Sequence, residues 1–426
     1  MKVLLISANT EQINMPVLPL GMACIAAAVQ GAGHDVKTAN LMMQQNTRML
    51  LKDAVEGFDP EVLGISVRNI DNQMMEPAGF LLDPVKAVIA ECRSLSKAPI
   101  VLGGAGYSIF PRSALDFLKA DMGIQGEGEA AFVALLERLE RKADLSSVPG
   151  LYLPASGLQK KAGFTNRLDD YPLPLPDIHL SLPSALKDKE VWLPFQTRRG
   201  CPMDCSYCST AAIEGRILRK HSVKWAMELI RKHADAGFDR FFFVDNTFNF
   251  PLSYAKTLCD QIVATGLKIG WRCILYPWQI DDGLVEKMAA AGCREVSLGF
   301  ESGSAEILKR LNKRFKPEDV RRISAMLKKQ GIHRMGFLLL GGPGETKETV
   351  KKSLCFADAL EIEMMKITVG IRIYPQTALH RISVNDGVIA PHEDLLFPKF
   401  YVVKGLKGWL QKTVAEWMEK RPNRVR

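Results

Sequence analysis

The stretch Arg199-Gly200-Cys201-Pro202-Met203-Asp204-Cys205-Ser206-Tyr207-Cys208 contains three cysteines with the spacing Cys-x3-Cys-x2-Cys. Three thiolates on one short loop are typical of an iron-sulfur cluster, whereas a closed structural cluster or zinc site takes four protein ligands. No fourth Cys or His lies close by in the sequence, and the next candidate is His221. The spacing therefore predicts that Cys201, Cys205 and Cys208 hold a cluster with one iron open to an outside ligand. A few buried cysteines, or a zinc site completed by a distant residue, are the alternatives.

Strand-like apolar runs alternate with helical stretches from about residue 191 to residue 375, as expected for parallel strands joined by helices. The cysteine loop directly follows the first of these runs. Because ligands of parallel α/β folds bind at the carboxyl ends of the strands, the loops after these runs form the candidate site. The predicted strands are 193–197, 240–244, 268–274, 295–299, 335–340 and 367–373, with helices such as 223–236 and 319–330 between them.

The first 142 residues show an earlier alternation of the same kind. It predicts a Rossmann-like or flavodoxin-like parallel sheet that is buried on both faces. None of its loops carries the G-x-G-x-x-G pattern, so a nicotinamide dinucleotide is disfavoured. The predicted strands are 3–6, 35–39, 62–67, 100–102 and 122–125, with helices such as 21–30 and 83–94.

Residues 143–187 and 377–426 lack this alternation of strand-like and helical stretches. Prolines punctuate residues 143–187, which favours an inter-domain linker, although an irregular subdomain packed against its neighbours is an equal alternative. Residues 377–426 include an amphipathic stretch at 406–419 and predict a small C-terminal cap. The predicted domains are therefore 1–142, 143–187 as a linker, 188–376 and 377–426.

Composition favours a cytoplasmic enzyme. Nine cysteines in 426 residues, six of them scattered singly, do not form the dense framework of a small secreted domain, so a reducing compartment is expected. The first residues are apolar too briefly for a signal peptide or membrane span. The net charge of +9 is a small difference between 56 basic and 47 acidic residues. It is poor evidence for nucleic-acid binding and only weakly favours an acidic substrate.

Beyond the cysteine motif, several segments resemble those of the cobalamin-binding radical S-adenosylmethionine (SAM) enzymes, and the resemblance covers nearly the whole chain. The segments are Leu18-Pro19-Leu20-Gly21, Gly103-Gly104, Gly126-Glu127-Gly128-Glu129, Gly299 to Ser304, Gly341 to Thr346 and Arg372 to Thr377. The resemblance implies an α/β chain with an N-terminal cobalamin-binding sheet, a partial (β/α)6 radical SAM barrel and a C-terminal cap. It also implies three cofactors: a 4Fe-4S cluster, SAM and cobalamin.

The resemblance implies that cobalamin lies at the strand ends of the first domain. Glycines there allow backbone amides to approach a bulky ligand closely. The motif Asp-x-His-x-x-Gly is absent, so cobalt would have no imidazole ligand from the protein. Arg68 would then lie beneath the corrin as a cation that cannot ligate cobalt, although a salt bridge at a strand end is an equal alternative. The implied cobalamin-binding residues are Leu18, Ser66, Arg68, Asn69, Gly103, Gly104, Gly126 and Glu127.

The resemblance also implies a SAM site at the strand ends of the second domain. Asp245 would accept from the SAM amino group, while a helix N-cap is its alternative role. Glu301 and Ser302 would lie near the ribose or methionine part of SAM, or would simply form a strand-end turn. The implied SAM-binding residues are Tyr207, Asp245, Asn246, Glu301, Ser302 and Arg372.

The implied activity is C-methylation of an unactivated carbon. The cluster and SAM would generate a 5′-deoxyadenosyl radical, and methylcobalamin would supply the methyl group. Cyclisation, ring contraction or oxidation without methyl transfer, and a non-catalytic iron-sulfur or corrinoid carrier, are the alternatives. The expected partners are a small-molecule or peptide substrate and an external electron donor such as flavodoxin or ferredoxin, without nucleic acid or a membrane span.

Overall fold

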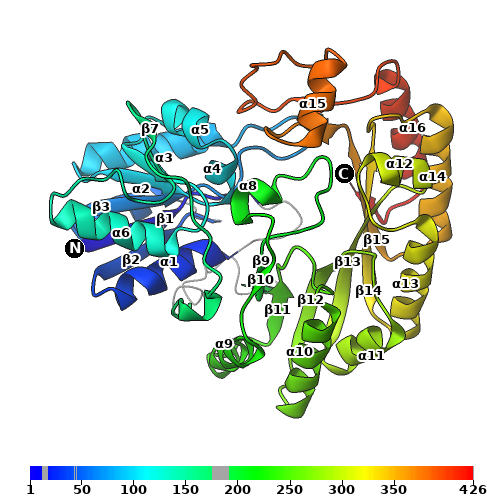
Figure 1. Cartoon of the computed structure of the whole chain (residues 1–426), viewed down its shortest axis with the longest axis horizontal. Coiled ribbons are helices and arrows are strands. Elements are labelled where there is room, and N and C mark those ends of the chain that lie inside the picture. Colours follow the sequence, from blue (N-terminus) through cyan, green and yellow to red (C-terminus); the bar gives the residue numbers. More distant parts are fainter. Residues whose placement is uncertain (12–17, 43, 45, 175–190, 426) are drawn as a thin grey trace. The chain divides into compact units, whose positions relative to one another are not determined.

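The computed structural model describes residues 1–11, 18–42, 44, 46–174 and 191–425. The chain divides into two compact units, and the division is not a single cut in the sequence (Figure 1). Unit 1 comprises Met1–Asn72, Gly79–Pro194 and Thr210–Gly215; unit 2 comprises Gln73–Ala78, Phe195–Ser209 and Arg216–Arg426. The cysteine loop therefore belongs to unit 2, whereas the short helix that follows it belongs to unit 1.

Unit 1 is built on a seven-stranded sheet whose first five strands are parallel. Their spatial order, 2-1-3-4-5, is the flavodoxin-like order, in which ligands bind where the order reverses between β1 and β3. This confirms the predicted parallel sheet. In spatial order the strands are β2 (Asp35–Asn40), β1 (Lys2–Ser7), β3 (Val62–Ser66), β4 (Ile100–Gly103), β5 (Met122–Ile124), β6 (Leu151–Leu153) and β7 (Gly157–Leu158).

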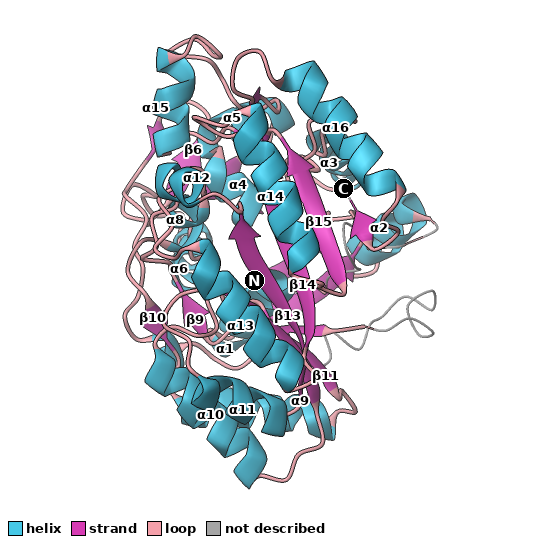
Figure 2. Ribbon diagram, turned by 90° about the vertical axis from the view of Figure 1, so that its right-hand side faces the viewer, coloured by secondary structure: helices cyan, strands magenta, loops and turns pink. Residues whose placement is uncertain are grey.

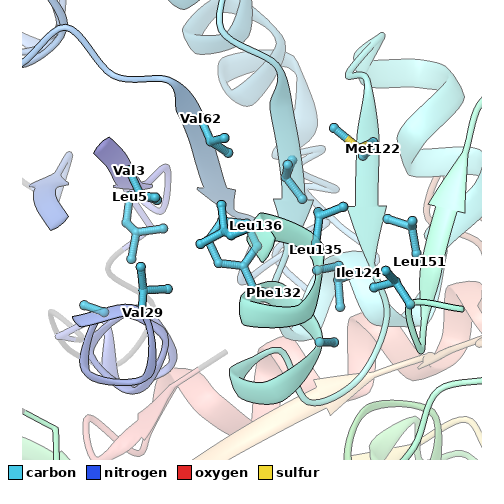
Figure 3. Packing of buried hydrophobic residues seen from close by; sticks show 14 of the residues in the cluster. Val3, Leu5, Val29, Val62, Met122, Ile124, Phe132, Leu135, Leu136 and Leu151 are labelled. Atoms are coloured by element: carbon cyan, nitrogen blue, oxygen red, sulfur yellow. The ribbon is translucent and has the colours of Figure 1, made fainter. Parts of the chain in front are cut away.

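Helices cover this sheet because successive side chains of its inner strands are apolar on both faces. Val3 and Leu5 of β1 pack toward Val29 of α1 and Phe132 and Leu136 of α6 (Figure 3). All five side chains are at most 4% exposed. The helices are α1 (Leu20–Gly31), α2 (Thr47–Glu56), α3 (Leu82–Leu95), α4 (Ala105–Ile109), α5 (Pro111–Leu118), α6 (Glu129–Glu140) and α8 (Thr210–Glu214), with a 3-10 turn at Leu168–Asp170.

The stretch predicted as a linker differs from that prediction in its first part. Strands β6 and β7 pair antiparallel and extend the first sheet beyond β5. Leu151 and Val148 are at most 1% exposed and belong to the apolar core of unit 1. Two strands this short carry too little period-2 pattern to be recognised among prolines. Residues 175–190 of the predicted linker lie outside the described residues.

The second sheet is open and consists of seven strands, whose order agrees with the predicted strand series. Its neighbouring strands from β11 to β18 are parallel. In spatial order they are β18 (Arg424–Val425), β15 (Met364–Val369), β14 (His333–Leu340), β13 (Cys293–Glu301), β12 (Gly270–Leu275), β11 (Arg240–Phe243) and β8 (Leu193–Phe195). No closed barrel forms from the described strands, which fits a partial barrel.

Helices α10, α11, α13 and α14 lie along one face of this sheet (Figures 1 and 2). Side chains that point to them are buried, whereas alternate ones such as Ile274, Ser297 and Phe337 remain partly exposed. Two of these helices, α11 and α14, begin at the caps Asp281 and Thr346, whose side chains accept a backbone amide. The helices of unit 2 are α9 (Val223–Asp235), α10 (Leu252–Ala264), α11 (Asp282–Ala290), α12 (Ala305–Arg310), α13 (Pro317–Lys329), α14 (Lys347–Ala359), α15 (Ala378–Asn385) and α16 (Lys407–Glu419).

The C-terminal tail contributes a strand to the second sheet, which the predicted cap did not include. Its strand β18 extends the sheet at the β15 edge, and Trp417 and Arg421 bind Asp358 of α14 at 3.1 and 2.7 Å. The predicted strand 367–373 is interrupted at Gly370, whose φ of 81° ends β15. The short β16 (Ile371–Arg372) then pairs with β17 (Phe400–Tyr401) of the tail. No helix among the described residues is long and apolar enough to cross a membrane.

Candidate active site

A pair of short strands flanks the cysteine loop. Strands β9 (Arg198–Arg199) and β10 (Arg219–Lys220) pair antiparallel on its two sides. Gly200 then turns the chain with a φ of 82°, a conformation that glycine adopts without strain. Cys201, Cys205 and Cys208 all remain partly exposed. The loop thus presents its thiols near the carboxyl end of β8, as predicted.

Four consecutive residues between α12 and α13 hold this loop, and we call Leu311–Arg314 the clamp. The carbonyl of Leu311 accepts from the Ser206 amide at 3.0 Å. The side chains of Asn312 and Arg314 donate to the carbonyls of Asp204 and Pro202 at 2.7 and 2.9 Å. Sequence reasoning missed the clamp because its partners lie more than 100 residues away, and only its position after the Gly299–Ser304 segment could have drawn attention to it.

Lys313, the third residue of the clamp, contacts the cysteine loop through its side chain. Its Nζ atom lies 2.9 Å from the Tyr207 hydroxyl and 3.2 Å from Oε1 of Glu301. The side chain is only 4% exposed. The Tyr207 hydroxyl donates to the same Glu301 oxygen at 2.9 Å. The structure therefore brings Tyr207 and Glu301 together at the cluster loop, two residues predicted separately.

The charges of this group follow from its burial. Burial lowers the pKa of Lys313, but Tyr207, Glu301 and Cys205 outweigh it, so the pKa lies well above its usual value and the ammonium is retained. Burial, reinforced by Glu301, holds the pKa of Tyr207 well above its usual value, so the phenol stays neutral. Burial also raises the pKa of the Cys205 thiol, while Lys313 acts in the opposite direction. An ammonium thus faces a thiol in a site with little water.

Glu301 adopts an uncommon backbone conformation to reach this position. Its φ is 61°, and the register of β13 against β14 shifts between Gly299 and Glu301. Such conformations in residues other than glycine cost about 1–3 kcal/mol and persist where surrounding contacts enforce them. Here the enforcing contacts are those with Tyr207 and Lys313. The strand end is therefore shaped to aim this carboxylate at the cysteine loop.

Asp245 is held by partners within the protein. Its carboxylate is fully buried and accepts from the amides of Thr197 and Arg198 at 2.7 and 2.8 Å. It also accepts from the Thr197 hydroxyl at 2.6 Å and pairs with the Arg198 guanidinium at 2.5 Å. These bonds order the backbone that leads into the cysteine loop. A contact of Asp245 with the SAM amino group stays a prediction.

Ser302 and Arg372 also differ from their predicted contacts with SAM. Ser302 is fully buried, and its hydroxyl lies 3.0 Å from that of Ser353 in α14. Arg372 is 5% exposed and donates to the carbonyls of Ile373 and Leu395 at 2.7 Å each. Both side chains therefore hold the strand ends and the tail in place. Asn246 is partly exposed after β11, and its contact with SAM stays a prediction.

Glu345 is a buried carboxylate at the carboxyl end of β14. Its Oε2 atom accepts from the amides of Gly341 and Gly342, whereas Oε1 is buried without a partner among the described residues. Burial raises the pKa of Glu345 to about 7, although the two amides partly oppose the shift. This carboxyl group is therefore balanced between its two protonation states near neutral pH.

This pKa predicts a pH dependence of stability. Because the folded-state pKa lies above the ordinary value of 4.5, the folded chain holds a proton that the unfolded chain has released. The resulting stability is complete below pH 4.5 and is lost as the pH rises through about 7, by roughly 3 kcal/mol. Urea unfolding of Glu345→Gln and wild type from pH 5 to 8 should show the variant gaining relative stability. Parallel profiles would contradict the prediction, and exposed Glu348→Gln is the control.

The donor chemistry fits a 4Fe-4S cluster. Three thiols on one loop, with an ammonium beside Cys205, provide three ligands and leave one iron for SAM. In the part of the chain that the structure describes, no three His, Cys, Asp or Glu side chains already converge as a metal site. The loop thus supplies the ligand set, while the clamp fixes its backbone.

Unit 1 has a hollow where flavodoxin-like sheets bind ligands. The hollow lies between the loops after β1 and β3 and is lined by Ala8, Asn9, Thr10, Glu11, Val67, Arg68, Asn69, Leu81, Pro84 and Val85. Nδ2 of Asn9 is buried there without a hydrogen-bond partner in the described structure. The exposed Arg68 side chain donates to Asn69 at 3.3 Å. Two of the predicted cobalamin-binding residues, Arg68 and Asn69, thus meet in this hollow.

Glycines at neighbouring strand ends leave room for a large ligand. A Cβ added to Gly103, at the end of β4, would meet no atom within 4 Å. Gly104 has a φ of 100°, and a Cβ there would lie 2.7 Å from the Val67 carbonyl oxygen. Gly126 is also left-handed, with a φ of 86°. These features fit the broad, close approach that a corrin requires.

The other predicted cobalamin contacts are placed differently. Leu18 is 2% exposed and belongs to the apolar interior of unit 1, so its side chain does not face an open site. Ser66 is partly exposed at the end of β3, and its carbonyl accepts from the Ala8 amide at 3.3 Å. Glu127 accepts from the Thr165 amide at 3.2 Å. Contacts of Ser66 and Glu127 with cobalamin stay predictions.

Two models of known protein families match this chain. The model of the B12 binding domain matches residues 6–136, and that of the radical SAM superfamily matches residues 196–357. The chain therefore contains a B12 binding domain and a radical SAM domain, and these domains imply cobalamin, a 4Fe-4S cluster and SAM as cofactors. This confirms the resemblance predicted from the sequence.

Individual relatives resemble the chain over most of its length. It is 27% identical to an uncharacterized methyltransferase of Pyrococcus horikoshii, covering 99% of this chain and 91% of the relative. It is 26% identical to the cytidylyl-2-hydroxyethylphosphonate methyltransferase of Streptomyces wedmorensis, covering 92% and 84%. The radical SAM methyltransferase TsrM from Kitasatospora setae, solved with cobalamin and a [4Fe-4S] cluster, superimposes with a TM-score of 0.81 at 23% identity over 92% of this chain and 76% of that one. The superposition on TsrM establishes the fold of this chain.

Proposed function

We propose that the protein is a cobalamin-dependent radical SAM C-methyltransferase. The observation that carries the proposal is the presence, in one chain, of a clamped three-cysteine loop and of a hollow at the switch point of a flavodoxin-like sheet, with open space at Gly103 of the neighbouring strand end. When bound, the cluster and SAM supply a carbon-centred radical, and cobalamin supplies a methyl group. Methyltransferase relatives that align with nearly the whole chain support the same conclusion.

The residues of the protein would contribute binding, orientation and exclusion of water. Cys201, Cys205 and Cys208 would ligate the cluster, and the clamp would fix their loop. Arg68 and Asn69 would face the cobalamin from the loop after β3, with Gly103 leaving room for the corrin. Cofactor chemistry of this kind needs orientation more than it needs an acid or base.

The overall reaction would break one C–H bond of the substrate and form one C–CH3 bond. Two SAM molecules would be consumed: one would give methionine and 5′-deoxyadenosine, and the other S-adenosylhomocysteine. Two electrons would come from an external donor such as flavodoxin or ferredoxin. We propose a small-molecule substrate, as tryptophan is in a substrate-bound structure of TsrM, and a reducing cytoplasmic location that keeps the cysteines as thiols.

One relative favours an alternative outcome. The anaerobic magnesium-protoporphyrin IX monomethyl ester cyclase of Rubrivivax gelatinosus is 23% identical over 79% of this chain and 61% of its own length. Mass spectrometry with SAM labelled in its methyl group separates the two functions. Transfer of the labelled methyl to a product one CH2 heavier supports methylation, whereas an unlabelled oxidised or cyclised product supports the alternative. Absence of any SAM cleavage would favour a carrier.

The placement of cobalamin predicts the effect of filling the space at Gly103. Gly103→Val should leave folding unchanged, because a Cβ there has no protein atom within 4 Å, yet it should remove most corrinoid binding. Cobalt per chain after desalting, together with circular dichroism, measures both. Gly163→Val, at an exposed glycine that is equally open, is the matched control. Full cobalt retention in Gly103→Val would place the corrin elsewhere.

A further inference from the structure

Lys313 is a buried cation in contact with Tyr207, which lies between the predicted cluster ligands Cys205 and Cys208 in the sequence. Its Nζ atom lies 5.1, 5.6 and 6.0 Å from the ring centroids of Tyr207, Tyr276 and Phe315. Glu301 is its carboxylate partner at 3.2 Å. With 4% exposure, the charge is little screened by water.

We propose that Lys313 raises the reduction potential of the cluster by holding its buried ammonium beside the cysteine loop, against Tyr207, and that Glu301 limits this effect. Reduction adds one electron from the external donor and breaks no bond, so a nearby positive charge stabilises the reduced form. Net charge, hydrogen bonds to the sulfurs and solvent exposure are the properties by which proteins tune such potentials. The inference rests on the proposed ligation by the three cysteines and adds a role for a residue outside the motif.

The residues that hold the backbone of the cysteine loop are different from the residue that carries the buried charge. Leu311, Asn312 and Arg314 already hold the backbone of the cysteine loop at three points. Lys313 hydrogen-bonds the loop through a side chain, that of Tyr207. Loss of its charge should therefore change the potential more than it changes the position of the loop.

The test is a redox titration of the reconstituted full-length protein, followed by electron paramagnetic resonance without added SAM. Lys313→Met should lower the midpoint potential, because the carboxylate of Glu301 then remains uncompensated. Glu301→Gln should raise it, because the ammonium then acts unopposed. We expect each change to alter the ratio of reduced to oxidised cluster at a fixed potential about tenfold, which for one electron is about 59 mV.

Control variants test whether the change in midpoint potential comes from the charge of Lys313. Lys309→Met removes an exposed lysine four residues earlier and should leave the potential unchanged. Lys313→Arg keeps the charge, and Tyr207→Phe removes the two hydrogen bonds of the hydroxyl without removing a charge, so both should keep a midpoint potential near that of wild type. Should Lys313→Met fail to retain iron, the direction of Glu301→Gln still decides. Shifts of the same sign in both charge variants, or none, would overturn the inference. Lack of a cluster in the wild type would instead overturn the proposed function.

Discussion

Replacing Cys201, Cys205 or Cys208 by alanine should remove the cluster and abolish SAM cleavage. Two remaining thiolates cannot hold a cluster that needs three protein ligands and one open iron. Iron after anaerobic reconstitution should fall from about four atoms per chain to near zero. The visible absorption of the cluster should disappear with it. Iron analysis and assay of 5′-deoxyadenosine measure the two effects on the same preparation.

A matched control separates ligation from general loss of thiols. Cys355 is exposed in α14 and belongs to no part of the cysteine loop. Cys355→Ala should retain full iron content and full SAM cleavage. Retention of the cluster in a variant of the triad, or its loss in Cys355→Ala, would show that the ligands lie elsewhere.

Among the variants proposed for this protein, Asp245→Ala should cause the largest decrease in the free energy of unfolding. The Arg198 guanidinium is 1% exposed and would remain buried without its carboxylate, while two backbone amides and the Thr197 hydroxyl would lose their acceptor. Breaking a buried ion pair in this way costs about 3–5 kcal/mol. Urea unfolding followed by circular dichroism should show a lower midpoint. Incorporation of iron should fall as well, because the same bonds order the entry to the cysteine loop.

Two comparisons test whether the buried charge is the cause. Asp260→Ala removes a carboxylate from an exposed pair with Lys287 and should change stability by about 0.5 kcal/mol or less. Arg198→Met combined with Asp245→Asn removes both charges but keeps an acceptor for the amides. This double variant should be more stable than Asp245→Asn alone. Equal instability of the two would mean that packing, and not the charge, dominates.

The sequence by itself determined the cofactor class and the order of the main elements. The three cysteines lie within eight residues, so their ligand set is a local property that needs no knowledge of the fold. The alternation of strands and helices is local as well, because periods of 2 and 3.6 residues show within each element. Elements too short for a period, such as β6, β7 and β18, escaped recognition for the same reason.

Only the tertiary structure decided which side chains at the strand ends meet. Asp245 lies 48 residues from Thr197, and Lys313 lies 106 residues from Tyr207, yet both are direct partners. Parallel strands carry residues from distant parts of the chain to one edge, and strand order then selects the partners. The fold surrounds the carboxylate of Asp245 with partners from the protein itself and makes Lys313 a charged neighbour of the cysteine loop. Both results depend on water being excluded from a site that only the assembled sheet creates.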